Sequence, residues 1–219
     1  MTMANARQFL ATRTAAWAKS GYTAKDYVQD GLIGMWDGIE NAGWGVHDPN
    51  ATAWKDLAGS TDLEVYGRFE KDRVVSVGKN ENGVVRYFGR WNTSIFDIAF
   101  KYDSIIQGDN GCVKLGRWTS IYYDPTGWLN CSSYPNKLNS QIVNGTSHHI
   151  CLSSGFWLDG ALLSQTEEPR APYSAENDAQ RFLYSVNGAI FGIRRYSRSL
   201  TEDEIAHNYA IDKARFGLT

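Results

Sequence analysis

Acidic side chains are the first candidates for chemistry, because glycoside hydrolysis needs two carboxyl groups held close together. A retaining enzyme places them about 5–5.5 Å apart, a spacing that alternate positions of one β-strand can supply. The acidic runs of this chain lie elsewhere: residues 202–204 have the pattern of a helix start, and residues 167–168 precede Pro169 in a loop. The chain also has no Gly-x-Ser-x-Gly elbow and no Gly-x-x-x-x-Gly-Lys phosphate loop. The sequence therefore predicts that the protein is not an enzyme.

Thiol and imidazole groups do not change this prediction. Cys151 follows His148 and His149, but residues two or three apart on one strand seldom form a nucleophile and a base with an orienting third group. The three cysteines form no CxxC pair, which argues against a zinc site. We expect reduced thiols and no organic cofactor.

Aromatic side chains in polar, glycine-containing surroundings are the second candidates. The C–H face of a pyranose packs on an exposed indole or phenol ring, while nearby polar groups bind its hydroxyls. Residues 115–135 are the richest stretch, although a single Trp is more often a core residue than a ligand contact. We predict a carbohydrate-binding face formed by Trp91, Trp118, Tyr123, Trp128 and Tyr134.

The composition excludes several other classes of partner. The 219 residues carry 22 Lys and Arg against 24 Asp and Glu, a formal net charge of −2. That balance gives no field that would attract nucleic acid or an anionic membrane. No apolar stretch approaches the roughly 20 residues that span a bilayer, and no signal-peptide pattern follows Met1. We therefore expect neither a nucleic-acid partner nor a membrane partner.

Residues 1–27 differ from the rest of the chain and are predicted to form a basic helical arm. Four basic residues precede the first acidic residue, Asp26, and neither Gly nor Pro occurs in residues 1–20. Alanine-rich sequence without these two residues favours a helix. The arm either lies against the following domain, residues 28–219, or projects from it as an attachment or oligomerisation segment.

From Gly31 onward, short apolar runs alternate with turn residues. Residues 95–100 alternate large apolar side chains with Asp97 and Ala99, which is typical of a strand with one buried face. Residues 182–186 are expected to form one strand. Ten or more such runs predict an all-β fold: a two-sheet antiparallel jelly-roll sandwich with an N-terminal helix and a short C-terminal helix.

Two local motifs are more specific than these apolar runs. Asp159-Gly160 lies between two apolar runs and suits a type I′ turn, which needs positive φ at both central residues. Thr201 and Glu204 have the spacing of a capping box, so a helix is predicted to begin there and to run to about Arg215.

Several segments, taken in order, resemble a known family. They are DGLIGMWDGIEN (30–41) with AWKDLAG (53–59), HHICL (148–152), FWLDGAL (156–162), and GAIFGIRRYSRSLTEDEI (188–205) followed by Tyr209. Together they resemble the laminin-G-like (LamG) domains of the concanavalin A-like lectin/glucanase superfamily, in versions found in gut bacteria and their prophages. The resemblance covers about residues 28–215 and implies a concanavalin A-like jelly roll.

The resemblance also has implications for sites. The glucanases of the superfamily carry a Glu-x-Asp-x-Glu run, which this chain lacks, so the resemblance implies a non-catalytic module. LamG-like domains often hold one Ca²⁺, and the matching positions here are Asp37 and Asp56, whose oxygens suit that ion. Residues 59–61 depart from the family's pattern. The alternative is that both aspartates are hydrogen-bonded turn residues.

These patterns support one function and leave two alternatives. We expect a lectin-like module that binds a glycan or cell-surface polysaccharide, such as a phage surface or tail-associated adhesin, on a virion surface or in the bacterial cytoplasm. The first alternative is a structural virion decoration or fibre protein that engages other virion proteins through residues 1–27. The second is a glycoside hydrolase with carboxylates at other positions.

Overall fold

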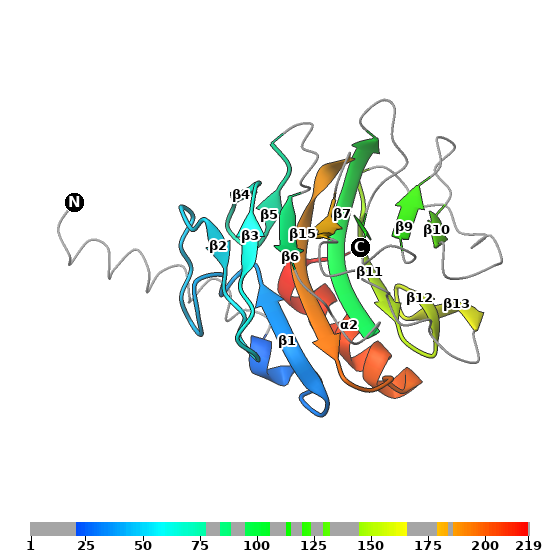
Figure 1. The fold of residues 1–219 in the computed structure, drawn as a ribbon. Helices are drawn as coiled ribbons and strands as arrows, with labels where there is room; N and C mark the ends of the chain where they lie inside the picture. The colour runs from blue at the N-terminus through cyan, green and yellow to red at the C-terminus, as the bar shows by residue number, and fades with distance from the viewer. Residues whose placement is uncertain are drawn as a thin grey trace.

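The computed structural model describes residues 21–77, 84–88, 95–105, 113–114, 120–123, 129–131, 145–165, 179–183 and 186–218. They form two antiparallel β-sheets and a C-terminal helix, so the predicted all-β sandwich is confirmed (Figure 1). Residues 1–20, where the N-terminal helix was expected, lie outside the described residues.

The first sheet has eight strands in the order β13-β12-β11-β7-β15-β5-β4, and β1 also pairs with β15. The two longest strands, β7 and β15, lie side by side at its centre (Figure 1). The bounds are β1 Leu32–Asp37, β4 Arg68–Phe69, β5 Val74–Val75, β7 Ile95–Ile105, β11 Ser147–Leu152, β12 Gly155–Leu158, β13 Ala161–Gln165 and β15 Val186–Tyr196.

The second sheet has seven strands in the order β10-β9-β8-β14-β6-β3-β2. The expected single strand over residues 182–186 is wrong, because β14 ends at Phe182 and Leu183 takes a φ of 51° that interrupts the extended chain. The chain then changes sheets and begins β15. The bounds are β2 Ala53–Trp54, β3 Leu63–Val65, β6 Val85–Phe88, β8 Val113–Lys114, β9 Ser120–Tyr123, β10 Leu129–Cys131 and β14 Ala179–Phe182.

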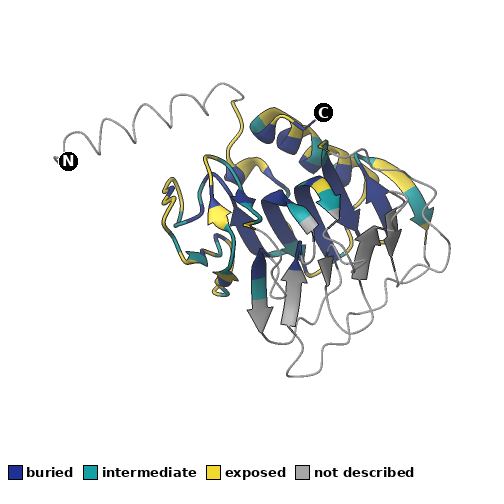
Figure 2. Ribbon diagram, turned by 90° about the horizontal axis from the view of Figure 1, so that it is seen from above, coloured by how far each residue is buried: buried dark blue, intermediate teal, exposed yellow. Residues whose placement is uncertain are grey.

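The helix α2, Glu202–Phe216, covers the outer face of the first sheet, so the molecule has three layers (Figure 2). The largest apolar cluster lies between the two sheets and includes Phe96 and Ile98 of β7. Three smaller clusters lie under the helix, and each contains one α2 residue: Ile205, Ile211 or Phe216. Residues 95–100 are therefore buried on both faces, not on one as the alternation predicted.

The predicted capping box at the start of α2 is confirmed. The Thr201 hydroxyl accepts a hydrogen bond from the Glu204 backbone N–H, and the Glu204 carboxylate accepts one from the Thr201 backbone N–H. The helix ends at Gly217, whose φ of 68° suits glycine. Among the described residues, no helix has the length and apolar character needed to cross a membrane.

Thr201→Ala is expected to lower the free energy of unfolding by about 1 kcal/mol, because it leaves the Glu204 N–H at the helix start without its side-chain acceptor. Urea unfolding followed by circular dichroism measures this loss. Thr201→Ser keeps the hydroxyl and is the control. Equal losses in the two variants would show that the cap contributes nothing.

Candidate functional site

A β-bulge in β15 turns an arginine toward α2. Ile190 pairs with Phe100, but the next paired residue is Gly192, opposite Ala99, so Phe191 is extra. One extra residue shifts the alternation of side chains by one position. Arg194 consequently lies opposite Asp97, on the face of the sheet that α2 covers.

Four charged or titratable side chains meet under α2 and form what we call the buried charge cluster: Asp97, His149, Arg194 and Asp212. Each is at most 1 % exposed. The Arg194 Nη2 lies 2.5 Å from Asp97 Oδ1 and 2.5 Å from Asp212 Oδ2, and its Nη1 donates to Asp212 Oδ1 at 2.8 Å. The His149 Nε2 lies 2.7 Å from Asp97 Oδ1. The cluster therefore joins β7, β11 and β15 to α2.

Neutral groups add one hydrogen bond to each carboxylate of the cluster. The Tyr27 hydroxyl donates to Asp212 Oδ1 at 2.7 Å, and the Asn208 Nδ2 donates to Asp97 Oδ2 at 2.6 Å. Buried polar groups are tolerated when they are hydrogen-bonded in this way. Tyr27 also ties the chain before β1 to the helix.

The cluster controls the protonation of its own members. Burial by itself would raise the pKa of Asp97, but the charges of Arg194 and His149 hold that pKa well below its usual range. Burial by itself would lower the pKa of His149, but the charge of Asp97 and the hydrogen bond to it raise that pKa instead. With His149 protonated, two cations balance two anions.

Asp97, His149 and Asp212 offer ligand atoms within 4.8 Å of one another, which is close enough for a metal ion. However, the Arg194 guanidinium contacts both carboxylates and supplies the positive charge that a cation would bring. No open position faces solvent, because all four side chains are buried. We interpret the cluster as the polar anchor of α2.

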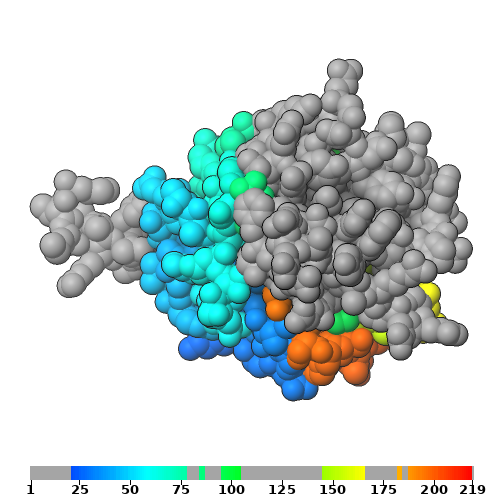
Figure 3. Space-filling model, viewed as in Figure 1, coloured from blue at the N-terminus to red at the C-terminus, as the bar shows by residue number. Residues whose placement is uncertain are grey.

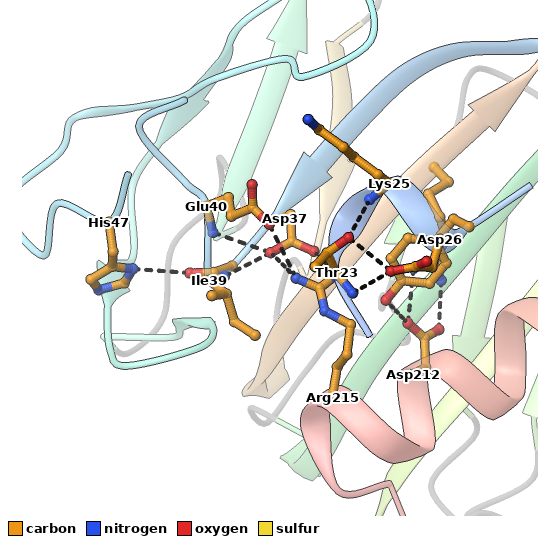
Figure 4. Close-up of polar contacts among 12 residues, drawn as sticks. Thr23, Lys25, Asp26, Asp37, Ile39, Glu40, His47, Asp212 and Arg215 are labelled. Atoms are coloured by element: carbon orange, nitrogen blue, oxygen red, sulfur yellow. Dashed lines mark hydrogen bonds and ion pairs between the residues drawn. The ribbon is translucent and has the colours of Figure 1, made fainter. Parts of the chain in front are cut away.

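A second network, drawn in Figure 4, fixes the loop that follows β1. The two terminal guanidinium nitrogens of Arg215 donate to the buried Asp37 carboxylate. Nη1 donates to Oδ2 at 2.6 Å, and Nη2 donates to Oδ1 at 3.2 Å. Asp37 Oδ1 also accepts from the backbone N–H groups of Ile39 and Glu40. The Glu40 carboxylate lies 3.5 Å from the same arginine.

Asp56, the second residue predicted to bind calcium, holds a turn. Its Oδ1 accepts from the backbone N–H groups of Met35, Ala58 and Gly59, and its Oδ2 accepts from that of Thr61. The oxygens of Asp56 and Asp37 therefore face N–H donors, an arrangement that does not fit a Ca²⁺ ion between them. The calcium site at Asp37 and Asp56 stays a prediction, and the geometry matches its turn-residue alternative.

The predicted hairpin at Asp159-Gly160 joins β12 to β13, with φ of 50° and 78° at the two residues. The Asp159 carboxylate contacts the His148 Nδ1 at 2.7 Å, and the His148 Nε2 lies 2.6 Å from the Thr146 hydroxyl. A hydroxyl, an imidazole and a carboxylate in line are the parts of a nucleophilic triad. Here Asp159 also accepts a hydrogen bond from the His149 backbone N–H. These contacts therefore hold the β12–β13 hairpin against β11.

The structure describes only part of the predicted carbohydrate-binding face. Tyr123 belongs to β9 of the second sheet, at the register position opposite Leu129. Its side chain, and the residues Trp91, Trp118, Trp128 and Tyr134, lie outside the described residues, so these assignments stay predictions.

One exposed tryptophan was missed at the sequence level. Of the four tryptophans that the structure describes, Trp36, Trp54 and Trp157 are at most 6 % exposed, whereas Trp44 is 44 % exposed. Trp44 stands between Gly43 and Gly45, and this Gly-Trp-Gly run was the available signal.

The outer face of the second sheet carries a polar and aromatic group. The Arg86 Nη2 donates to Glu64 at 3.1 Å and to the Tyr66 hydroxyl at 2.6 Å, and its guanidinium lies 4.8 Å from the centre of the Tyr66 ring. Val65 and Val85, the neighbours of these residues along β3 and β6, pack in the core between the sheets. The three polar side chains therefore point away from the core.

No protein-family model and no curated protein matches the chain. Among solved structures, it is similar to Trypanosoma rangeli sialidase in complex with 2,3-difluorosialic acid, at 11 % identity and a TM-score of 0.64, and to the same enzyme with sialic acid, at 12 % and 0.60. In both cases the match covers 94 % of this chain but only 39 % of the sialidase. The chain thus spans about two fifths of these enzymes.

The chain is also similar to domain 4 of AbnA, a GH43 extracellular arabinanase from Geobacillus stearothermophilus, solved in complex with arabinotriose. The identity is 16 %, the TM-score is 0.52, and the match covers 82 % of this chain and 98 % of that domain. Unlike the sialidases, this domain is matched over nearly its whole length. At these identities the likeness shows the fold.

The sialidases contradict the prediction that the protein is not an enzyme. That prediction rested on the absence of catalytic sequence motifs, above all of two carboxylates at alternate positions of one strand. Such an absence excludes one catalytic arrangement and not catalysis in general, and the fold seen here is one that chains of enzymes contain. We therefore withdraw the prediction that the protein is not an enzyme.

Proposed function

We propose that the protein binds carbohydrate through a LamG-like β-sandwich. The observation that carries this proposal is the likeness to domain 4 of AbnA, which is matched over 98 % of its length and whose structure contains arabinotriose. The aromatic-rich stretch of residues 115–135 supports the proposal, because rings in polar surroundings suit the C–H faces of sugars.

We place the ligand face on the second sheet. The outer face of the first sheet is covered by α2, and among the described residues no α-helix lies on the outer face of the second sheet (Figure 2). That sheet contains β9, with Tyr123, and the polar and aromatic group of Glu64, Tyr66 and Arg86. An arginine, a carboxylate and a phenol ring are the side chains that bind hydroxyls and pack on a sugar.

The partner that we propose is a cell-surface polysaccharide, and the setting is a phage surface or tail-associated adhesin. The resemblance to LamG-like domains of gut bacteria and their prophages supports both. The attachment role of residues 1–27 stays part of this proposal. In the described portion of that arm, Ala24 and Tyr27 are buried against the domain.

Titration of the full chain with arabinotriose and with a panel of cell-wall and capsular oligosaccharides tests the proposal. Trp118→Ala and Trp128→Ala are expected to weaken binding about 2- to 12-fold each, since an aromatic contact contributes about 0.5–1.5 kcal/mol. Leu162→Ala, which removes an exposed apolar side chain from β13 of the other sheet, is the control. A chain that binds none of these sugars contradicts the proposal. Binding that both tryptophan variants retain in full contradicts the location.

A further inference from the structure

Exposed apolar side chains occur in two segments that meet beside β1, one before this strand and one after it. Three of the five exposed large apolar side chains among the described residues lie on residues 22–46: Tyr22, Trp44 and Val46. The Lys25 Nζ lies 5.4 Å from the centre of the Trp44 ring, so the segment before β1 contacts the loop after it. The first described residues, blue in Figure 3, lie at one side of the molecule next to the cyan residues that follow them.

The loop that carries Trp44 is held in one conformation by hydrogen bonds at its base and at its tip. At the base, the buried Asn41 side chain exchanges two hydrogen bonds with the Asp48 backbone, at 2.7 and 2.8 Å. At the tip, the Val46 N–H donates to the Gly43 carbonyl at 2.9 Å, which closes a turn around Trp44. A ring that is already positioned loses little conformational entropy when a ligand packs on it.

The tip is also connected to α2. The backbone N–H of Gly45 donates to Glu40 Oε2 at 2.9 Å. The other oxygen of Glu40 lies 3.5 Å from the buried Arg215 (Figure 4). Gly45 takes a φ of 69°, which suits glycine, and a Cβ built on Gly43 or Gly45 would have no atom within 4 Å. The backbone of the tip therefore has open space beside both glycines, and Glu40 holds it in place.

The charge beside the ring is that of the Lys25 ammonium. Among the described residues, no carboxylate lies within ion-pair distance of the Lys25 Nζ. Asp26, the next residue in the sequence, accepts from Thr23. Glu40, which lies on the Trp44 loop, accepts from Gly45 and pairs with Arg215. An exposed cation over an indole contributes only about 0.5–1 kcal/mol, so a ligand can displace it from the ring.

We infer that Trp44 and Lys25 form a subsite for an acidic sugar, whose C–H face packs on the Trp44 indole and whose carboxylate pairs with the Lys25 ammonium. The inference rests on the proposed carbohydrate binding and deepens it, because it names a class of sugar and a second contact region. A neutral sugar would use the indole and leave the lysine without a partner. The proposed face on the second sheet would then bind another part of the same glycan.

Two matched pairs of sugars test the inference: trigalacturonate against galactotriose, and sialyllactose against lactose. Within each pair, the acidic member supplies the carboxylate. In ¹H–¹⁵N spectra of the full chain, the indole signal of Trp44, assigned from its absence in Trp44→Phe, is expected to shift with the acidic sugars. Trp44→Ala is expected to weaken acidic binding about 10-fold, whereas Trp44→Phe retains most of it.

Lys25→Met is expected to weaken binding of the acidic sugars about 3- to 10-fold and to leave binding of the neutral sugars unchanged. Lys213→Met is the matched control, because Lys213 also lies 5.4 Å from an aromatic ring, that of Tyr209 on α2. Acidic sugars that bind the Trp44→Ala and Lys25→Met variants as tightly as the parent overturn the inference and leave the proposed function standing. Neutral sugars that bind as tightly as their acidic partners also overturn it. If no sugar of either kind binds, the inference and the proposed function both fail.

Discussion

Arg194→Met is expected to lower the free energy of unfolding by about 3–5 kcal/mol, the cost of removing one partner from a buried ion pair. The methionine fills a similar volume but supplies no charge, so the Asp97 and Asp212 carboxylates would face each other inside the protein. For a chain of this size, each kcal/mol corresponds to about 2–4 °C in Tm. Urea unfolding and a thermal scan by circular dichroism measure both quantities.

Arg68→Met is the matched control for this prediction. Arg68 also pairs with a carboxylate, Glu70, but its side chain is 67 % exposed. Exposed ion pairs contribute about 0–1 kcal/mol, so this variant should unfold nearly as the parent does. Equal losses in the two variants would contradict the role of the buried charge cluster. A third variant, Arg194→Lys, keeps one charge and is expected to recover part of the loss.

The features that the sequence predicts correctly are those determined by neighbouring residues. The capping box of Thr201 and Glu204 spans four residues, and the turn at Asp159-Gly160 needs only two residues with positive φ. Each motif works through backbone groups within one turn of chain, so its spacing can be recognised without knowledge of the fold. The alternation in residues 95–100 likewise identified β7 as a strand.

The features that the sequence misses depend on contacts between distant residues. Asp97 has the position of a solvent-facing residue in an alternating strand, but α2, more than 100 residues later, covers that face. The bulge at Phe191 is equally hidden, because only the pairing with β7 shows that a residue is extra. Arg194 consequently could not be recognised as the partner of Asp97.

The candidate ligand residues also fall into two groups: those that the sequence indicates and those that only the fold reveals. The aromatic stretch of residues 115–135 is visible in composition alone, but composition does not distinguish a core ring from an exposed one. Trp36, Trp44 and Trp54 lie within 18 positions of one another, and only the fold shows that Trp44 is exposed and the other two are buried. The Gly-Trp-Gly run indicates a turn, and the support by Glu40 and Arg215 requires α2 to be in place.

The free energy of unfolding is expected to fall as the pH rises above about 6.5, because the pKa of His149 is raised in the folded protein. Below the unfolded pKa the imidazole is protonated in both states, and its stabilising contribution is complete. Between the unfolded and the folded pKa the native state binds more protons than the unfolded state, so stability falls by up to about 1.4 kcal/mol per pH unit. Above the folded pKa the contribution is lost.

Other groups near His149 do not produce this slope. Burial raises the pKa of Cys151 and of Tyr27, so both stay neutral in this range. Asp97 has a lowered pKa and contributes stability above about pH 4, which is lost only as the pH falls further. The stability of the domain should therefore be highest between about pH 4 and 6.5.

Unfolding in urea at intervals from pH 4 to 9 measures the expected slope, and His149→Gln should remove it. The Gln amide can still donate to Asp97, but it does not titrate, so the two anions of the cluster face a single cation at every pH. His207→Gln replaces an exposed histidine on α2 and should keep the slope of the parent. A parent whose stability is level between pH 6 and 9, or a His149→Gln variant with an unchanged slope, would contradict the assignment. Either result would mean that His149 stays neutral and that Arg194 alone balances Asp97 and Asp212.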